Sequence, residues 1–185
     1  KLKRFEDTLD GMIFEKVGEL PVSIYETKES LYQIPDSSLF TPIHPGDMWG
    51  GEGVYGWFKT AFTVPQELAG KPLFLRPRMG GYEAMLWVDG KPFGTFATKI
   101  VQTGHGNHYC DMFVKSPKAG QEVNLVVEFY AGHYIIGCMP YEENPRHDFR
   151  FPFTSMDVCV KNDKIANFYF NLRTLNELIE VLDDT

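Results

Sequence analysis

The densest group of side chains capable of chemistry is the stretch His105-Gly106-Asn107-His108-Tyr109-Cys110-Asp111. Its two histidines, three positions apart, and its thiol could donate ligands to a zinc ion. A structural zinc site normally takes four ligands, and no second cluster of such residues follows in the sequence. We therefore interpret the stretch as a polar loop that joins two strands, and we predict no metal site in this chain.

Two features could contact a carbohydrate. The same loop supplies one set of candidates, for binding either a sugar or a neighbouring domain: His105, Asn107, His108 and Tyr109. Aromatic residues supply the other set, because an apolar sugar face packs on a flat π surface; they are Trp49, Trp57 and Trp87, with Tyr55 and Tyr82. Two of the tryptophans lie on strand faces opposite the predicted core. Such faces are often covered, so we favour buried packing against the N-terminal segment, a helix or another domain.

Catalysis needs side chains with matched roles, such as a nucleophile beside a base or two carboxylates at the separation that a glycosidase uses. The sequence contains no Ser-His-Asp order, no phosphate-binding loop with GK[ST] and no dinucleotide fingerprint. Carboxylates are plentiful, but most are expected on solvated strand faces and in turns. We predict no catalytic residue and no cofactor in this chain.

Composition limits the class of protein. The chain has 185 residues, of which 43% are hydrophobic, so it can bury one core of typical domain size. Its 15% aromatic residues, 17 Gly and 12 Pro suit an all-β protein with many turns. A net charge of −7 excludes nucleic acid as a partner, and the sequence has no membrane-spanning apolar run. Three widely spaced cysteines predict reduced thiols and a cytoplasmic protein.

Most of the elements that would position these side chains are strands. Apolar and polar residues alternate in VYGWFKTAFTV (54–64), KPLFLRPR (71–78), QEVNLVVEFY (121–130) and TSMDVCV (154–160), and a shorter strand is expected at 22–26. YEAMLWVDGKPFG (82–94) predicts a hairpin, because Asp89 and Gly90 suit a type I′ turn in which both residues have positive φ. Pro92 lacks an N–H and so places the return strand at a sheet edge. A second hairpin is expected to join 154–160 to IANFYF (165–170).

Helical spacing occurs at both ends of the chain. In residues 1–18 apolar side chains recur about once per helical turn, which predicts a short amphipathic helix. The segment NLRTLNELIEVLDD (171–184) carries an apolar stripe, with Asn171 as its expected N-cap. The second helix meets no Gly or Pro stop signal, which indicates a chain cut from a longer polypeptide.

These patterns predict an antiparallel β-sandwich of jelly-roll type, with short helical extensions at both termini. We expect an N-terminal extension packing on the sandwich at 1–49, the sandwich itself at 50–170, and a helix at 171–185.

The run GWFKTAFTVPQELAGKPLFLRPRMGGYEAMLWVDGKPFG (56–94) resembles the galactose-binding-like modules attached to glycoside hydrolases. VNLVVEFYAGHYIIG (123–137) and NFYFNLRTLNELIEVL (167–182) are similar to the N-terminal domain of family 38 glycoside hydrolases, the α-mannosidases. The resemblance covers residues 50–182. It implies that the helix at 171–185 starts a linker to a missing catalytic domain, which has a zinc ion held partly by a His-x-Asp motif and a carboxylate nucleophile that gives retaining hydrolysis. None of the five histidines here begins a His-x-Asp motif, so no catalytic residue is carried over.

The resemblance therefore implies a non-catalytic accessory domain of an α-mannosidase, which supports the catalytic domain, the assembly of a homo-oligomer or one wall of the substrate cleft. Zinc is expected in the missing catalytic domain and not here. One alternative is an autonomous carbohydrate-binding module that holds a glycan through loop aromatics and GHGNHY (104–109). Another is a free-standing zinc or thiol enzyme that uses His105, His108 and Cys110.

Overall fold

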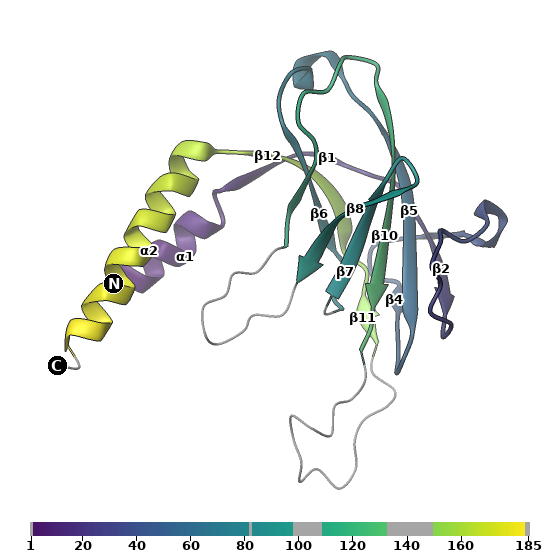
Figure 1. Ribbon diagram of the computed structural model, residues 1–185, viewed down its shortest axis with the longest axis horizontal. Helices are drawn as coiled ribbons and strands as arrows, with labels where there is room; N and C mark the ends of the chain where they lie inside the picture. Colours follow the sequence, from purple (N-terminus) through teal and green to yellow (C-terminus); the bar gives the residue numbers. More distant parts are fainter. Residues whose placement is uncertain (1, 82, 98–108, 133–149, 184–185) are drawn as a thin grey trace, which may run out of the picture.

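The computed structural model describes residues 2–81, 83–97, 109–132 and 150–183, and shows a two-layer β-sandwich with two helices beside it (Figure 1). In chain order the elements are α1 (Leu2–Asp10), β1 (Phe14–Glu19), β2 (Val22–Thr27), the 3-10 helix η1 (Ser37–Leu39), β3 (Thr41–Ile43), β4 (Met48–Trp49), β5 (Tyr55–Thr63), the 3-10 helix η2 (Gln66–Leu68), β6 (Leu73–Arg78), β7 (Glu83–Val88), β8 (Lys91–Ala97), β9 (Asp111–Val114), β10 (Glu122–Tyr130), β11 (Phe151–Pro152), β12 (Ser155–Lys161) and α2 (Asp163–Asp183).

Two antiparallel sheets make up the sandwich. The four-stranded sheet has the order β1-β12-β6-β9, and the six-stranded sheet has the order β3-β2-β5-β10-β7-β8. Strands that follow one another in the sequence, such as β5 and β6, lie in different sheets, so the chain crosses between the layers as it does in jelly rolls. The predicted all-β sandwich with helices at both ends is confirmed.

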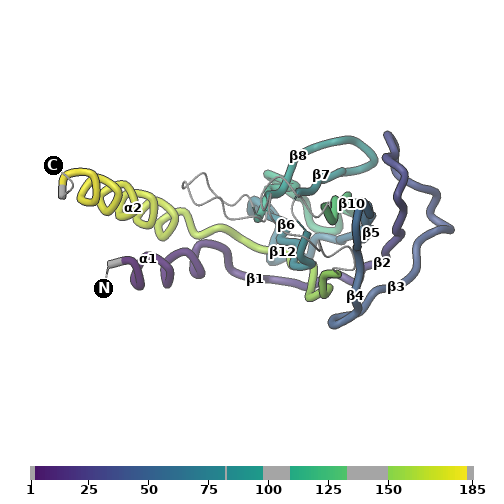
Figure 2. The backbone as a smooth tube through the Cα atoms, turned by 90° about the horizontal axis from the view of Figure 1, so that it is seen from below, coloured from purple at the N-terminus to yellow at the C-terminus, as the bar shows by residue number. Residues whose placement is uncertain are grey.

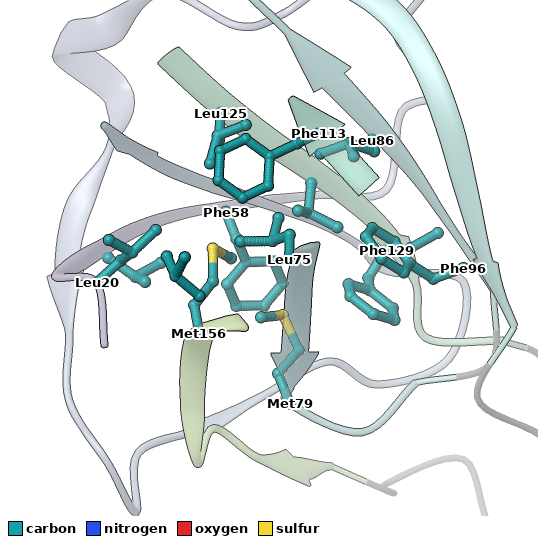
Figure 3. Packing of buried hydrophobic residues seen from close by; sticks show 14 of the residues in the cluster. Leu20, Phe58, Leu75, Met79, Leu86, Phe96, Phe113, Leu125, Phe129 and Met156 are labelled. Carbon is teal, nitrogen blue, oxygen red and sulfur yellow. The ribbon is translucent and has the colours of Figure 1, made fainter. Parts of the chain in front are cut away.

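The core lies between the two sheets (Figure 3). Phe58, Leu125 and Phe129 contribute from the six-stranded sheet, and Leu75 and Met156 from the four-stranded sheet; all five are fully buried. They occupy every second position of their strands, because successive side chains of a strand point to opposite faces. The alternation read from the sequence therefore identifies the core face of these strands.

The hairpin β7–β8 forms as predicted. Asp89 and Gly90 have φ values of 47° and 79°, as a type I′ turn requires. The Asp89 carboxylate also accepts a hydrogen bond of 2.9 Å from the backbone N–H of Asn124, so the turn is attached to β10. The return strand β8 is the edge strand that Pro92 predicts.

The N-terminal region differs from its prediction. The first helix ends at Asp10, and the residues after it form β1, which pairs with β12 at the edge of the four-stranded sheet. Both β2 and β3 belong to the six-stranded sheet. Much of the expected extension 1–49 is thus part of the sandwich, because its strands form an edge of each sheet.

The two helices lie side by side and project away from the sandwich, with the shorter α1 along the part of α2 nearer the sandwich (Figure 2). We call this pair the helical arm. Asn176 of α2 donates a hydrogen bond of 2.9 Å to Glu6 of α1, and the rings of Phe5 and Phe168 meet edge to face at 6.2 Å. Among the residues that the structure describes, neither helix has the length and continuous apolar character of a membrane span.

The predicted strand at 165–170 is wrong, because α2 begins at Asp163 and includes these residues. Asn162 caps the helix: its side chain accepts a hydrogen bond of 3.2 Å from the backbone N–H of Ile165. The predicted turn at 161–164 is therefore the start of a helix. Alternation of apolar residues over six positions was too short a pattern to exclude a helix.

Candidate functional site

Of the four loop residues predicted to contact a sugar or another domain, His105, Asn107 and His108 lie outside the described residues. Tyr109 is half-buried beside the four-stranded sheet. Its ring lies 6.0 Å from that of Phe14 and 5.1 Å from the Arg76 guanidinium. Burial and the negative charge of Asp10 raise the pKa of Tyr109 to about 12. Tyr109 thus joins the end of α1 to the sheet, and its contact with a sugar or another domain stays a prediction.

Two thiols lie near Tyr109. Cys110 and Cys159 are both buried and free. A hydrogen bond with Cys159, together with burial, raises the pKa of the Cys110 thiol. A thiol of raised pKa is a poor nucleophile, because the thiolate is the reactive form. Within the described ranges, no group of three or more His, Cys, Asp or Glu side chains is placed to hold a metal ion.

The three tryptophans are buried, as favoured from the sequence. Trp49 lies in the core and donates a hydrogen bond of 2.6 Å to the carbonyl of Met79. Trp57 and Trp87 lie on the outer face of the six-stranded sheet with their rings 5.9 Å apart. Residues 28–40, which we call the covering segment, pack over them through apolar side chains: Leu31, Ile34 and Phe40.

The covering segment is attached by polar contacts. Lys59 of β5 donates a hydrogen bond of 2.6 Å to Ser37, and its ammonium lies 5.6 Å from the centre of the Phe40 ring. Asp36 accepts a hydrogen bond of 2.8 Å from the backbone N–H of Ser38, which starts η1. The contacts of Lys59 hold the segment against the sheet, so Trp57 and Trp87 do not form an open platform for a sugar.

A second part of the same outer face has a different character. Strand register places Tyr130 between Tyr55 and Glu83, and in the next row it places Glu128 between Trp57 and Met85. Tyr55 and Tyr130 are partly exposed, and their rings lie 4.8 Å apart at an interplanar angle of 37°. We call Tyr55, Glu83, Met85, Glu128 and Tyr130 the tyrosine–glutamate face.

Glu128 is the carboxylate at the centre of this face. Burial raises its pKa, and a weak hydrogen bond from the Trp87 indole acts in the opposite direction. The geometry of that bond is poor, because the Trp87 Nε1 atom does not meet the distance and angle of a good hydrogen bond. Among the described residues no lysine or arginine charge acts on Glu128. The carboxylate therefore retains capacity to accept hydrogen bonds.

Three other carboxylates in the described ranges have structural partners. Asp157 is 2% exposed and forms an ion pair of 2.8 Å with the Lys16 ammonium. Asp47 accepts a hydrogen bond of 2.8 Å from the backbone N–H of His44, and Glu26 accepts one of 2.8 Å from Gly50. These groups stabilise loops and the outer face of the four-stranded sheet.

Sequence reasoning did not identify Glu128 and Tyr130 as site residues. The alternation in 121–130 placed them on the polar side of a strand, and Tyr55 and Trp57 were placed together on the strand 54–64. Pairing these two strands in register would have brought the four side chains together. The missing information was the register, which depends on contacts between segments far apart in the chain.

Comparisons with known proteins agree with this fold. A model of an Ams1-like family, described as the alpha-mannosidase jelly roll domain, matches residues 16–159. No curated protein sequence is significantly similar to the chain.

A search of solved structures finds a β-glucuronidase from Ruminococcus gnavus in complex with C6-substituted uronic isofagomine (13% identity, TM-score 0.47), which the chain matches over 80% of its own length and 29% of that chain. A calcium-binding mutant of Bacteroides uniformis β-glucuronidase 2 gives 19% identity and a TM-score of 0.48, over 80% of this chain and 18% of that one. The chain thus spans less than a third of the length of either enzyme. Because the family model covers well over half of the chain, the protein belongs to the alpha-mannosidase jelly roll domain family.

Proposed function

We propose that this chain is a non-catalytic accessory domain of an α-mannosidase, and that its helical arm docks on the catalytic domain of the same enzyme. The family match supports the parent activity, since the family is described as one domain of alpha-mannosidase. The observation that carries the docking role is an apolar stripe along α2.

The stripe follows the spacing of an interface helix. Phe168, Leu175, Ile179 and Leu182, together with the half-buried Leu172, are three or four positions apart, so they lie along one side of the helix. Leu175 is 57% exposed and Leu182 is 60% exposed, although both are large apolar side chains. The short helix α1 contacts Phe168 at the start of the stripe, whereas Leu175, Ile179 and Leu182 are largely exposed. Extended apolar patches of this kind mark protein–protein contacts.

The parent enzyme, in this proposal, hydrolyses α-mannosidic bonds with retention of configuration and uses a zinc ion held by its catalytic domain. No cofactor is assigned to the present chain. The free, buried thiols Cys110 and Cys159 are consistent with a reducing compartment, which supports a cytoplasmic location.

An activity assay tests whether the catalytic activity lies outside this chain. The isolated chain and the full-length enzyme are incubated with an aryl α-mannoside and zinc. We expect hydrolysis by the full-length enzyme only. Activity in the isolated chain would overturn the accessory role, and absence of α-mannosidase activity in the full-length enzyme would overturn the assignment of the parent.

Substitution in the stripe tests the docking role. In the full-length enzyme, the double variant Leu175→Glu, Ile179→Glu is expected to expose the arm to proteolysis and to lower thermal stability of the catalytic domain. The matched control Thr174→Glu introduces a carboxylate on α2 outside the stripe, and it should leave both properties unchanged. The stripe variant could instead keep the protease resistance and thermal stability of the control and no longer form the oligomer of the unmodified enzyme. In that case the stripe serves self-association.

A further inference from the structure

We propose that Cys110 and Cys159 are a redox-active pair. Hydrogen peroxide oxidises Cys159, and Cys110 then closes a disulfide bond that fastens residues 109–110 to the outer face of the four-stranded sheet. The bond would form within the chain itself, and it does not depend on the parent activity proposed above. In the reduced chain both thiols are buried and free.

Cys159 faces away from the core of the sandwich. It lies on β12 between Val158 and Val160, which both pack in the core cluster. Successive side chains of a strand point to opposite faces, so the Cys159 thiol is on the outer face of the sheet. It nevertheless has no exposed surface. Another part of the chain must therefore cover it.

Residues 109–110 provide this cover. The Tyr109 ring lies 6.0 Å from the ring of Phe14 on β1 and 5.1 Å from the guanidinium of Arg76 on β6. Strand β12 lies between β1 and β6 in the sheet, so a side chain that contacts both neighbours lies over β12. Cys110, the next residue, is 7% exposed and forms a hydrogen bond with the Cys159 thiol. The two sulfur atoms thus meet on the outer face.

The surroundings give the two thiols different roles. The hydrogen bond from Cys110 lowers the pKa of Cys159. The positive charges of Arg76 and Lys16 act in the same direction, whereas burial and the charge of Asp157 oppose them. The same hydrogen bond, together with burial, raises the pKa of Cys110. Because the thiolate is the nucleophile, Cys159 is the residue that attacks the oxidant, and Cys110 is the one that resolves the product.

The oxidation takes two balanced steps. In the first, the Cys159 thiolate attacks one oxygen of hydrogen peroxide, the O–O bond breaks, and the departing hydroxide takes up a proton from solvent to become water. In the second, the Cys110 sulfur attacks the sulfur of the sulfenic acid on Cys159. The S–S bond forms, the S–O bond breaks, and the Cys110 proton leaves with the hydroxyl as a second water. A dithiol reductant reverses the bond. Burial of both sulfurs favours a small oxidant over a bulky disulfide.

The bond would strengthen the junction between the helical arm and the sandwich. Tyr109 donates a hydrogen bond to Asp10, the last residue of α1. A disulfide at the next residue therefore fixes the segment that holds the end of α1. The two cysteines are 49 positions apart in the sequence, so the bond also restricts a long loop of the unfolded chain.

Mass spectrometry of the folded chain tests the pair. Treatment with hydrogen peroxide is expected to lower the intact mass by two hydrogen atoms, and proteolysis should then yield one linked peptide pair that contains Cys110 and Cys159. Dithiothreitol should restore the original mass. Cys138→Ser is the matched control, because it removes the third thiol and should leave the reaction unchanged. A link through Cys138, a gain of oxygen atoms without a link, or no reaction would each overturn the proposal.

Single variants separate the two roles. In Cys110→Ser the sulfenic acid on Cys159 should persist and be trapped by dimedone, whereas Cys159→Ser should react with peroxide about tenfold more slowly. Faster reaction of Cys110 than of Cys159 would contradict the assigned roles. Near-ultraviolet circular dichroism checks folding, and the alanine variants replace any serine variant that does not fold.

Thermal unfolding tests the fastening in the unmodified chain. The midpoint of the oxidised form should lie above that of the reduced form by about 5 °C or more, because the bond restricts the unfolded chain. Equal midpoints would overturn the proposed fastening of the junction.

Discussion

The sandwich buries its large apolar side chains, whereas the helical arm leaves several of them exposed. In the sandwich, large residues such as Trp49, Phe58 and Phe129 have no measurable exposure. In the arm, α2 exposes about half of the surface of Phe168 and Ile179. Burial of apolar surface is the main stabilising contribution to folding, so the sandwich carries its own stability. The exposed apolar residues of the arm contribute little to folding, and they form a surface that a partner could cover.

The largest expected effect concerns the core of the sandwich. Trp49→Ala removes a fully buried ring that packs edge to face on Phe58 at 5.0 Å and leaves the Met79 carbonyl without its donor. The free energy of unfolding should fall by about 3–5 kcal/mol. Urea denaturation followed by circular dichroism measures the change, and a loss below about 1 kcal/mol would contradict the comparison between sandwich and arm.

The next effect concerns the ion pair on the outer face of the four-stranded sheet. Lys16→Met leaves the buried Asp157 carboxylate without its cation. We expect a loss of about 1–3 kcal/mol in the free energy of unfolding. The exposed Lys71 provides the control, and Lys71→Met should have an effect within ~0.5 kcal/mol. Equal effects of the two variants would show that the pair does not stabilise the fold.

The hairpin turn should give a smaller effect. Gly90 has φ of 79°, and an added Cβ atom would meet no neighbour within 4 Å. Gly90→Val therefore introduces backbone strain without a clash, and stability should fall by roughly 1 kcal/mol or more. Lys91→Val at the next residue is the control. Its denaturation measures the effect of a new valine side chain without the strain at Gly90. If Gly90→Val kept full stability and lost sugar binding, the hairpin would belong to the binding site.

Alkaline pH should loosen the junction between arm and sandwich. The pKa of Tyr109 is raised from 10.0 to about 12, so between these values the unfolded chain releases the phenolic proton before the folded chain does. Stability conferred by the neutral phenol is therefore complete below pH 10 and falls as the pH rises towards 12. Thermal unfolding across this range should show a steeper decline for the unmodified chain than for Tyr109→Phe. Parallel declines would contradict the assignment.

The smallest effect is expected in the arm. Leu175→Ser combined with Leu182→Ser changes two exposed side chains, so the free energy of unfolding of the isolated chain should change by less than about 0.5 kcal/mol per site. Ala166→Ser is a useful contrast, because Ala166 is buried on the same helix. A large loss of stability in the double variant would show that the stripe packs within the chain.

Local patterns predicted much of the fold. The alternation around Phe58, Leu75 and Leu125 gave the core faces correctly, and Asp89-Gly90 gave the turn and its edge strand. The errors lie where a local pattern was short or ambiguous. Residues 165–170 alternate over too few positions to exclude the helix that Asn162 caps, and the region before Gly18 contains both a helix and a strand.

The sequence by itself determined the fold class, the hairpin and the buried character of the tryptophans, because these depend on side-chain polarity and backbone preference within a few residues. Only the tertiary structure decided that β5 and β6 lie in different sheets, that residues 14–43 supply strands to both, and that Tyr55, Glu128 and Tyr130 meet on one face. These features require pairing of distant segments; in β5 and β10 the paired residues are 59 to 75 positions apart in the sequence. Such pairing is selected by the burial of the whole core and not by any one segment.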